Sequence, residues 1–350
     1  MNTDKIQTAF PASGLGNPHL PGNFSKDKEL VKMDITAIGE ILIDLTQTGF
    51  SETGVPLFAA NPGGAPANVA VAASRLGART AFIGKVGDDS FGEYLRGVLE
   101  TDGVDCAGLR RDRRPTTMAI VSVDAGGERS FRFVRGADSE LSPDAVNELA
   151  VLGSKILHFG SVSLTPGLSR SATIFAARSA HRAGVTVSYD PNYRPALWND
   201  RTDAVEWMRL PLPLVDILKL AEEELPLLTG TSDLDSGSAL LENQGIRLIL
   251  ITLGSSGVFC RWQGRTWRQP GVPVKVADTN GAGDTFFGAV LSRLSRREGG
   301  PLADLTASEL KDILAFANRA AAFTCSRSGA IPAMPRMSDL FDEDGRPRLP

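Results

Sequence analysis

The sequence predicts an α/β fold, with a mostly parallel central sheet and helices on both of its faces. Short runs of β-branched and large apolar residues alternate with stretches of helical spacing along most of the chain, which is the pattern of repeated strand–helix–strand units. The chain has 350 residues, of which 42% are hydrophobic, and this is enough to fill the core of one large α/β domain with a small appendage.

Each expected element follows from the spacing of its apolar residues. Short, almost uninterrupted apolar runs predict strands near 35–43, 80–84, 155–160, 185–190, 214–219 and 247–252. Apolar positions three and four residues apart predict helices near 66–76, 89–101, 168–183, 233–244, 284–297 and 307–325. Because parallel strands need long crossover connections, this order favours a parallel sheet.

Two segments, about 44–60 and 107–136, interrupt this rhythm. In the second segment Ala119, Val121 and Val123 alternate with other residues, which is typical of a half-buried antiparallel strand. We therefore expect antiparallel strands in these two segments.

The ends of the chain are expected to lie outside the domain. Residues 1–33 contain repeated Pro and Gly and lack the apolar core of a signal peptide, so they are predicted to be a disordered extension. The domain is then expected over 34–335, with a C-terminal tail at 336–350.

Composition narrows the functional classes. The net charge of −4 and the pI of about 5.6 argue against a nucleic-acid partner, and no segment has the length and apolarity of a membrane span. The three cysteines and three histidines are scattered, which favours neither a disulfide framework nor a zinc site. A cytoplasmic protein is expected.

A short segment at 278–286, with the sequence DTNGAGDTF, has the composition of a phosphoryl-transfer site. The helical spacing that follows it places Gly281, Ala282 and Gly283 at a helix N-terminus, where free N–H groups form an anion hole. Asp284 would stand beside the anion and accept the proton of an attacking hydroxyl. A capped turn without catalytic function is the alternative.

A second glycine pair precedes the helix expected at 66–76. Gly63 and Gly64 allow a ligand to approach the backbone closely, and Asn68 offers both a donor and an acceptor to a polyhydroxylated ligand. Asp44 ends the buried strand that begins at Asp34, and a carboxylate at such a strand end can hold two adjacent hydroxyl groups.

These two glycine segments resemble, in order and separation, the two signatures of the ribokinase-like (PfkB) sugar-kinase family. Within that family the chain is most similar to fructokinases, in GEILIDL at 39–45, FIGKVGDDSFG at 82–92, GERSF at 127–131, LHFGS at 157–161, DPNYR at 190–194 and EEEL at 222–225. The resemblance covers roughly residues 34–335. It implies a ribokinase-like fold in which the segments 44–60 and 107–136 form a β lid over the sugar, and it leaves open a homodimer through that lid.

The resemblance also implies an ATP site, although the chain has neither a P-loop nor a dinucleotide fingerprint. The turn with Thr252, Gly254 and Gly257 resembles the ATP-binding turn of the family, although alone it is more typical of a β-hairpin. Asn318 would flank the adenine; the alternative is an exposed polar residue on a helix.

Metal use follows from the resemblance with two departures. Glu224 matches the Glu of the Asn-x-x-Glu motif that organises Mg²⁺ through water, but the Asn position is Ala221. An ordinary charged helix start is the alternative for Glu224. Asp278 and Asn280 match the loop that holds a monovalent cation in the family, although Thr is commoner than Asn at the position of Asn280. Since Asn280 still offers an oxygen ligand, use of K⁺ stays open.

The expected activity is ATP-dependent phosphorylation of a sugar, with fructose giving fructose 6-phosphate. The main alternative is a 2-keto-3-deoxygluconate kinase, because arginines lie on the expected lid and Arg135 is placed at the edge of the sugar crevice, where it could bind a carboxylate. Other PfkB sugar or nucleoside kinases remain alternatives within the class. A non-catalytic sugar-binding regulator on the same fold is the alternative of a different class.

Overall fold

The computed structural model describes residues 32–123, 129–342 and 344–348. The predicted N-terminal extension, 1–33, lies outside the described residues except for its last two, and Met33 already opens the first strand. Residues Met33–Pro350 form one compact unit.

Within the described residues, nine strands form the main sheet, in the order β13-β12-β11-β10-β9-β8-β1-β4-β5. Their bounds are β1 (Met33–Ile38), β4 (Thr80–Gly87), β5 (Val104–Asp112), β8 (Ser154–Gly160), β9 (Thr186–Asp190), β10 (Ile217–Ala221), β11 (Leu248–Thr252), β12 (Val258–Trp262) and β13 (Arg265–Gln269). From β11 to β5 every pair is parallel, and the hairpin of β12 and β13 adds two antiparallel strands at one edge. The predicted mostly parallel sheet is confirmed.

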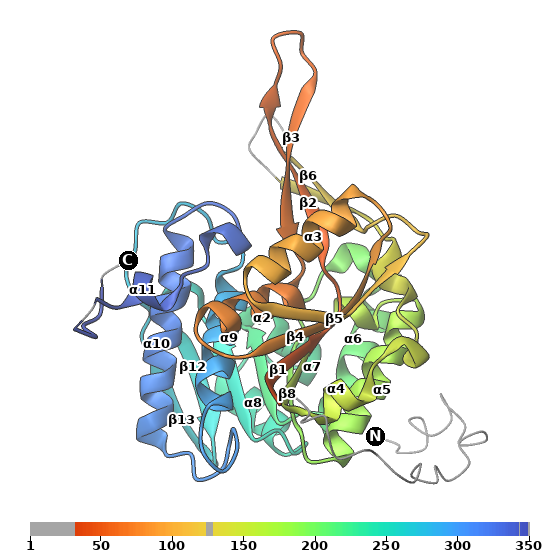
Figure 1. The fold of residues 1–350 in the computed structure, drawn as a ribbon. Helices are drawn as coiled ribbons and strands as arrows, with labels where there is room; N and C mark the ends of the chain where they lie inside the picture. The colour runs from red at the N-terminus through yellow and green to blue at the C-terminus, as the bar shows by residue number, and fades with distance from the viewer. Residues whose placement is uncertain (1–31, 124–128, 343, 349–350) are drawn as a thin grey trace, which may run out of the picture. The chain divides into compact units, whose positions relative to one another are not determined.

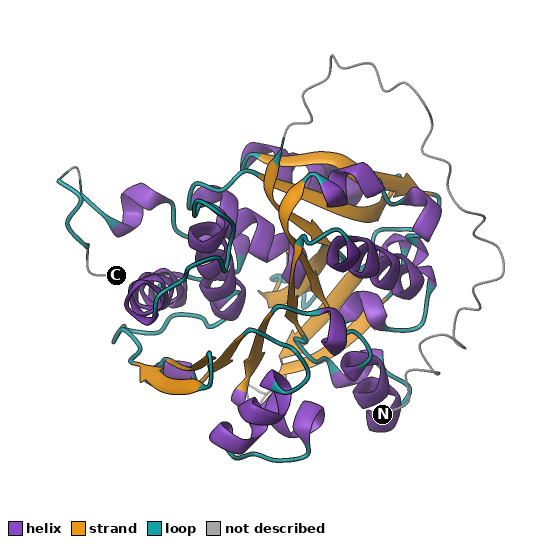
Figure 2. Ribbon diagram, turned by 90° about the horizontal axis from the view of Figure 1, so that it is seen from below, coloured by secondary structure: helices purple, strands orange, loops and turns teal. Residues whose placement is uncertain are grey.

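Helices cover both faces of this sheet, as Figures 1 and 2 show. One face packs against α2 (Ala65–Arg75), α3 (Ser90–Thr101), α9 (Ala282–Ser295) and α10 (Ala307–Cys325). The other packs against α4 (Glu148–Leu152), α5 (Leu168–Arg182), α6 (Arg201–Arg209), α7 (Leu225–Thr229) and α8 (Leu234–Glu242). Burial on both faces explains the continuous apolar runs of the parallel strands.

Four strands form a second, smaller sheet, which we call the lid. They are β2 (Leu42–Phe50), β3 (Pro56–Gly63), β6 (Met118–Val123) and β7 (Arg129–Val134), in the order β3-β2-β6-β7. β2 pairs with β3 and β6 with β7 in antiparallel fashion, whereas β2 and β6 run parallel. In Figure 1 the hairpin of β2 and β3 rises away from the main sheet.

Two sequence predictions need correction here. The strand expected over 35–43 is two strands of different sheets, because the chain turns at Gly39, with φ of 149°, between β1 and β2. Asp44 therefore belongs to the lid. The lid segment expected at 107–136 begins too early, since β5 is an edge strand of the main sheet, and its half-exposed alternation imitates an antiparallel strand.

The C-terminal segment 336–350 was expected to be a tail. Its described residues include α11 (Met337–Leu340), in which Leu340 is buried. The ring of Phe341 stacks on Phe316 of α10, with centroids 6.0 Å apart. This part of the chain is thus packed against the main unit.

Candidate active site

A cavity of about 340 Å³ lies between the lid and the carboxyl ends of the parallel strands. The lid contributes Asp44 and Asn61, and the chain after β9 contributes Asn192 and Arg194. The N-termini of α2 and α9 complete the wall. This is the position at which ligands bind in open α/β sheets.

The N-terminus of α9 faces this cavity. Gly281 caps the helix in the left-handed conformation, with φ of 73°, and lines the cavity. Its conformation favours glycine, whereas a Cβ on Gly283 would lie 3.1 Å from Nζ of Lys219 and would require only a small shift of that side chain. Ala282 and Gly283 open the helix beside Gly281, as expected, although they are not among the residues lining the cavity.

Asp284, in the first turn of α9, lines the same cavity and is 8% exposed. Its Oδ2 accepts a 2.8 Å hydrogen bond from Nδ2 of Asn68 on α2. Burial raises the pKa of Asp284, and the charge of Asp190 adds to this effect. A buried carboxylate with a raised pKa is suited to take a proton from a hydroxyl group.

Asp44 reaches the cavity from β2. Burial raises the pKa of Asp44 to about 6, Arg194 acts in the opposite direction, and the charge of Asp284 raises the pKa further. A Cβ on Gly63 would collide with the carboxylate of Asp44, and a Cβ on Gly64, where φ is 107°, would lie 2.6 Å from the carbonyl oxygen of Glu40. The glycine pair is thus required by close packing around Asp44 and Glu40.

Glu40 is a cavity residue that the sequence analysis missed. It is 2% exposed, and its Oε1 accepts a 3.0 Å hydrogen bond from the N–H of Ala65 at the start of α2. Burial raises the pKa of Glu40 to about 8, and the charge of Asp138 contributes to the increase. The available signal was a glutamate inside an otherwise apolar run.

Beneath the start of α9 lies a buried cluster of charges. Nζ of Lys219 is 2.8 Å from Oδ2 of Asp190, and both side chains are at least nine-tenths buried. The two carboxylate oxygens of Glu224 accept hydrogen bonds from the N–H groups of Tyr193, at 2.6 Å, and Ala221, at 2.7 Å. Burial raises the pKa of Glu224, as does Asp190, whereas Lys219 lowers it.

The residues expected to bind the nucleotide lie beyond the cavity. β11 and β12 form a hairpin whose turn contains Gly254, with φ of 56°, and Gly257, with φ of 98°, so the hairpin interpretation is confirmed. Thr252 ends β11. Asn318 is 7% exposed and donates to the carbonyl of Pro270 at 2.8 Å, so the alternative of an exposed residue is wrong.

In the loop expected to hold a monovalent cation, the side chain of Asp278 is hydrogen-bonded within the loop and to the chain after α10. Asp278 accepts hydrogen bonds from the backbone N–H groups of Asn280 and Gly329, both at 3.1 Å. Asn280 and Gly329 line the cavity. The loop thus lies against the chain that follows α10, and within the described residues no cluster of three His, Cys, Asp or Glu could hold a metal ion.

Arg135 does not line the cavity, whereas Phe133, two residues earlier on β7, does. The guanidinium of Arg135 forms an ion pair with Asp138 at 2.9 Å. The carboxylate that Arg135 binds in this structure is thus that of Asp138, and its expected contact with substrate stays a prediction.

Residues 32–337 match the model of a known protein family, the "pfkB family carbohydrate kinase" family. The chain is 40% identical over 314 residues to a probable fructokinase-4 of Arabidopsis thaliana, covering 87% of this chain and 95% of that protein. It also resembles the crystal structure of a fructokinase with bound ATP from Xylella fastidiosa, with a TM-score of 0.82 and 32% identity over 88% of this chain and 97% of the other. A fructokinase mutant from Vibrio cholerae in a form with bound fructose, ADP and potassium gives a TM-score of 0.77 and 30% identity, over 88% and 97%.

Proposed function

The chain belongs to the pfkB carbohydrate kinase family and is an ATP-dependent sugar kinase, and from this premise we propose that it converts fructose to fructose 6-phosphate. One observation carries the proposal for the site. Asp284 stands buried at the N-terminus of α9, in the same cavity as Asp44 and Asn68. The arrangement combines a base, an anion-binding helix end and acceptors for sugar hydroxyls.

Each residue has a role in this reaction. Asp44 and Asn68 hold sugar hydroxyls, and Asp284 takes the proton of the primary hydroxyl as it attacks the γ-phosphorus of ATP. The N–H groups at Gly281, Ala282 and Gly283 stabilise the charge on the transferring phosphoryl group. The lid over the cavity excludes water, which would otherwise compete as the acceptor.

The charge of the cavity favours a neutral sugar. Among the described residues, its ionisable lining groups are the carboxyl groups of Glu40, Asp44 and Asp284 and the guanidinium of Arg194. An acidic sugar would add a carboxylate to this set, while Arg135 is already occupied by Asp138. These observations support fructose over 2-keto-3-deoxygluconate. The presence of Asp284 supports an enzyme over a non-catalytic regulator.

We further propose that Mg²⁺ and K⁺ assist the reaction. Oδ1 of Asp190 is buried and has no hydrogen-bond partner within the described residues, and together with Glu224, acting through water, it offers the oxygen chemistry that Mg²⁺ prefers. Mg²⁺ would neutralise phosphate charge. Asp278 and Asn280 would hold K⁺, while Thr252, Gly254, Gly257 and Asn318 would contact ATP.

We also propose a homodimer through the lid. The hairpin of β2 and β3 leaves large apolar side chains exposed, namely Phe50, Val55, Leu57 and Phe58. Exposed apolar groups concentrated on one hairpin are typical of an interaction surface.

We also propose that the protein is cytoplasmic, because its three cysteines are free. No helix in the described part of the chain could span a bilayer.

The test measures ATP-dependent phosphorylation of fructose, glucose, ribose and 2-keto-3-deoxygluconate by the parent, Asp284→Asn and the exposed control Asp312→Asn. We expect fructose to be preferred by the parent, and kcat of Asp284→Asn to fall by about 10²–10⁴-fold, with fructose affinity by calorimetry changed only a few-fold. Asp312→Asn should match the parent. The proposal would be contradicted if Asp284→Asn turned over fructose at nearly the rate of the parent, or if the parent preferred 2-keto-3-deoxygluconate to fructose.

A further inference from the structure

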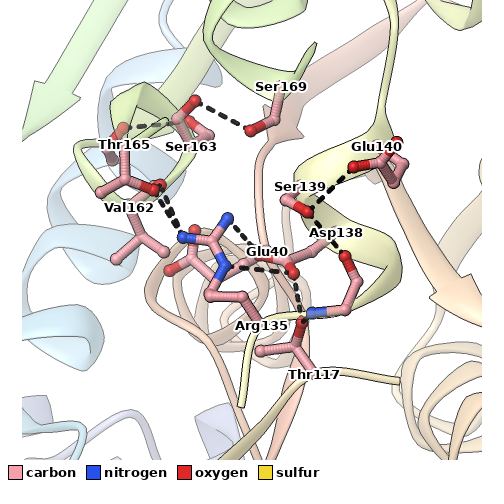
Figure 3. A network of polar contacts seen from close by, with 12 residues as sticks. Glu40, Thr117, Arg135, Asp138, Ser139, Glu140, Val162, Ser163, Thr165 and Ser169 are labelled. Atoms are coloured by element: carbon pink, nitrogen blue, oxygen red, sulfur yellow. Dashed lines mark hydrogen bonds and ion pairs between the residues drawn. The ribbon is translucent and has the colours of Figure 1, made fainter. Parts of the chain in front are cut away.

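The lid is joined to the main unit by four passages of chain, and Figure 3 shows residues of three of them, Glu40, Thr117 and Arg135, together in one polar cluster. The passages run from β1 to β2, from β3 to α2, from β5 to β6, and from β7 to the short helix η1 (Ala137–Glu140). The fourth passage ends at Ala65, the first residue of α2, whose N–H donates to Glu40. Such a convergence can set the angle of the lid.

Arg135 contacts two segments of the main unit. Its Nη2 lies 2.9 Å from Oδ2 of Asp138, and its Nη1 donates to Oγ1 of Thr165 at 2.5 Å and to the carbonyl of Val162 at 3.3 Å. Val162 belongs to the short helix η3 (Val162–Leu164), which follows β8 of the main sheet. Arg135 therefore fixes the end of a lid strand to two places on the main unit.

Thr117 ties a second passage to the same carboxylate. Its hydroxyl donates to Oδ1 of Asp138 and accepts from the N–H of Gly136 at 2.7 Å. The N–H of Ala137 donates to the carbonyl of Pro115 at 2.9 Å, and a Cβ on Gly136 would collide with that carbonyl. The passages from β5 to β6 and from β7 to η1 are thus held together at van der Waals contact.

Glu40 connects the remaining two passages and the cavity. Its Oε1 accepts from the N–H of Ala65, and its carboxyl group lies within the electrostatic influence of Arg135 and Asp138. Glu40 and Val162 also line the cavity, whereas Arg135 does not. The polar cluster thus forms the base of the lid and one wall of the site.

We propose that Arg135 is a positioning residue that clamps the lid at the angle which places Asp44 opposite Asn68 and Asp284, and that it does not bind the substrate. The proposal rests on the proposed sugar-kinase function only for its kinetic consequence. Without Arg135, Asp138 loses its cation and η3 loses its link to β7. The sugar-binding residues of β2 would then no longer be held in register with those of the main unit.

The decisive variants are Arg135→Ala and Thr165→Val, with Arg132→Ala as the matched control. Thr165 is buried, is nearly isosteric with valine and does not line the cavity. Arg132 lies on β7, three residues before Arg135, and its side chain is exposed. Hydrogen exchange of the amides in Leu42–Phe50 and Pro56–Gly63 is measured without any substrate. In Arg135→Ala we expect hydrogen exchange in both hairpin strands to accelerate by about tenfold or more, because the ion pair with Asp138 and the hydrogen bond to Thr165 are both lost. In Thr165→Val the acceleration should be smaller, because only the hydrogen bond is lost. Arg132→Ala should match the parent.

Steady-state kinetics form the second arm. Arg135→Ala and Thr165→Val should both raise the fructose KM, by about tenfold or more in the first, leave the ATP KM within about twofold, and increase ATP hydrolysis in the absence of sugar. Unchanged hairpin exchange in Arg135→Ala, or a KM effect in Arg135→Ala with none in Thr165→Val, would overturn the proposal in favour of direct substrate contact. If no sugar is phosphorylated at all, the proposed function fails, but the exchange arm still decides the role of Arg135.

Discussion

Three carboxyl groups in the cavity have raised pKa values, those of Glu40, Asp44 and Asp284, and the pKa of Asp44 predicts a pH dependence of sugar binding. Burial, reinforced by Asp284 and opposed by Arg194, brings the pKa of Asp44 to about 6, within the range in which kinases are assayed. In the proposed role of Asp44, the ionised carboxylate accepts sugar hydroxyls at both of its oxygens, whereas protonation turns one of them into a donor. Fructose binding should therefore be strongest above pH 6 and weaken as the pH falls below it, by at most about tenfold for each pH unit.

The measurement is the dissociation constant of fructose by calorimetry between pH 5 and 8, without nucleotide, so that the chemistry at Asp284 does not enter. In Asp44→Asn the affinity should be lower at pH 8 and should lose the decrease centred near pH 6. If the fructose affinity of Asp44→Asn still fell below pH 6 as it does in the parent, the titrating group would be a residue other than Asp44.

At the residue scale, the predictable part of the site is the part whose chemistry sits in a local motif. Asp284, Gly281 and Asn68 could be predicted because glycines next to a helical pattern mark an anion-binding helix end whatever the fold. Glu40 could not, because its importance arises only when the chain turns at Gly39 and brings Asp138 and Ala65 to it. No periodicity in the sequence records that turn.

At the element scale, the start of α2 depends on Gly64. Its φ is 107°, and an added Cβ would lie 2.6 Å from the carbonyl oxygen of Glu40 and 2.9 Å from Cα of Ile41. Neither backbone atom can move without shifting the connection between β1 and β2. Gly64→Ala should lower the free energy of unfolding by roughly 1–3 kcal/mol and raise the fructose KM.

Gly97 offers the matched control for urea unfolding. It lies inside α3, and nothing stands within 4 Å of its added Cβ. Gly97→Ala should raise the stability by about 0.5–1 kcal/mol, because alanine loses less backbone entropy in a helix. A Gly64→Ala protein as stable as the parent would show that the connection at Glu40 is not rigid.

The elements themselves were predictable to different degrees. The helix expected over 307–325 is found as Ala307–Cys325, because its amphipathic spacing follows from the face it buries. The helix expected over 66–76 is found as Ala65–Arg75, with every residue from Ala65 to Ala73 buried. The strand expected over 35–43 failed because a continuous apolar run does not reveal a change of sheet. β5 was misassigned because an edge strand of a parallel sheet is half exposed.

At the scale of the whole molecule, the alternation of strands and helices determines a parallel sheet, and a parallel sheet determines where the ligand lies. What the alternation does not encode is the lid, whose strands come from two insertions that pair with each other: β2 runs parallel to β6 with Ile43 opposite Met118. Such long-range pairing depends on side-chain fit between distant segments. The lid therefore had to be inferred from a family resemblance.

The same lid provides the prediction for assembly. Leu57 is 48% and Phe58 42% exposed, and as neighbours on β3 they point to opposite faces of the hairpin. If two copies of the chain dock through one face of the lid, a charge on that face is buried in the dimer, whereas a charge on the other face stays in water. One of Leu57→Glu and Phe58→Glu should therefore weaken the dimer by about 30-fold or more, and the other by much less. Sedimentation velocity across a concentration series measures this, with Tyr94→Glu as the control, since Tyr94 is similarly exposed on α3 outside the lid. A parent that stays monomeric at all concentrations, or a dimer weakened only by Tyr94→Glu, would move the interface away from the lid.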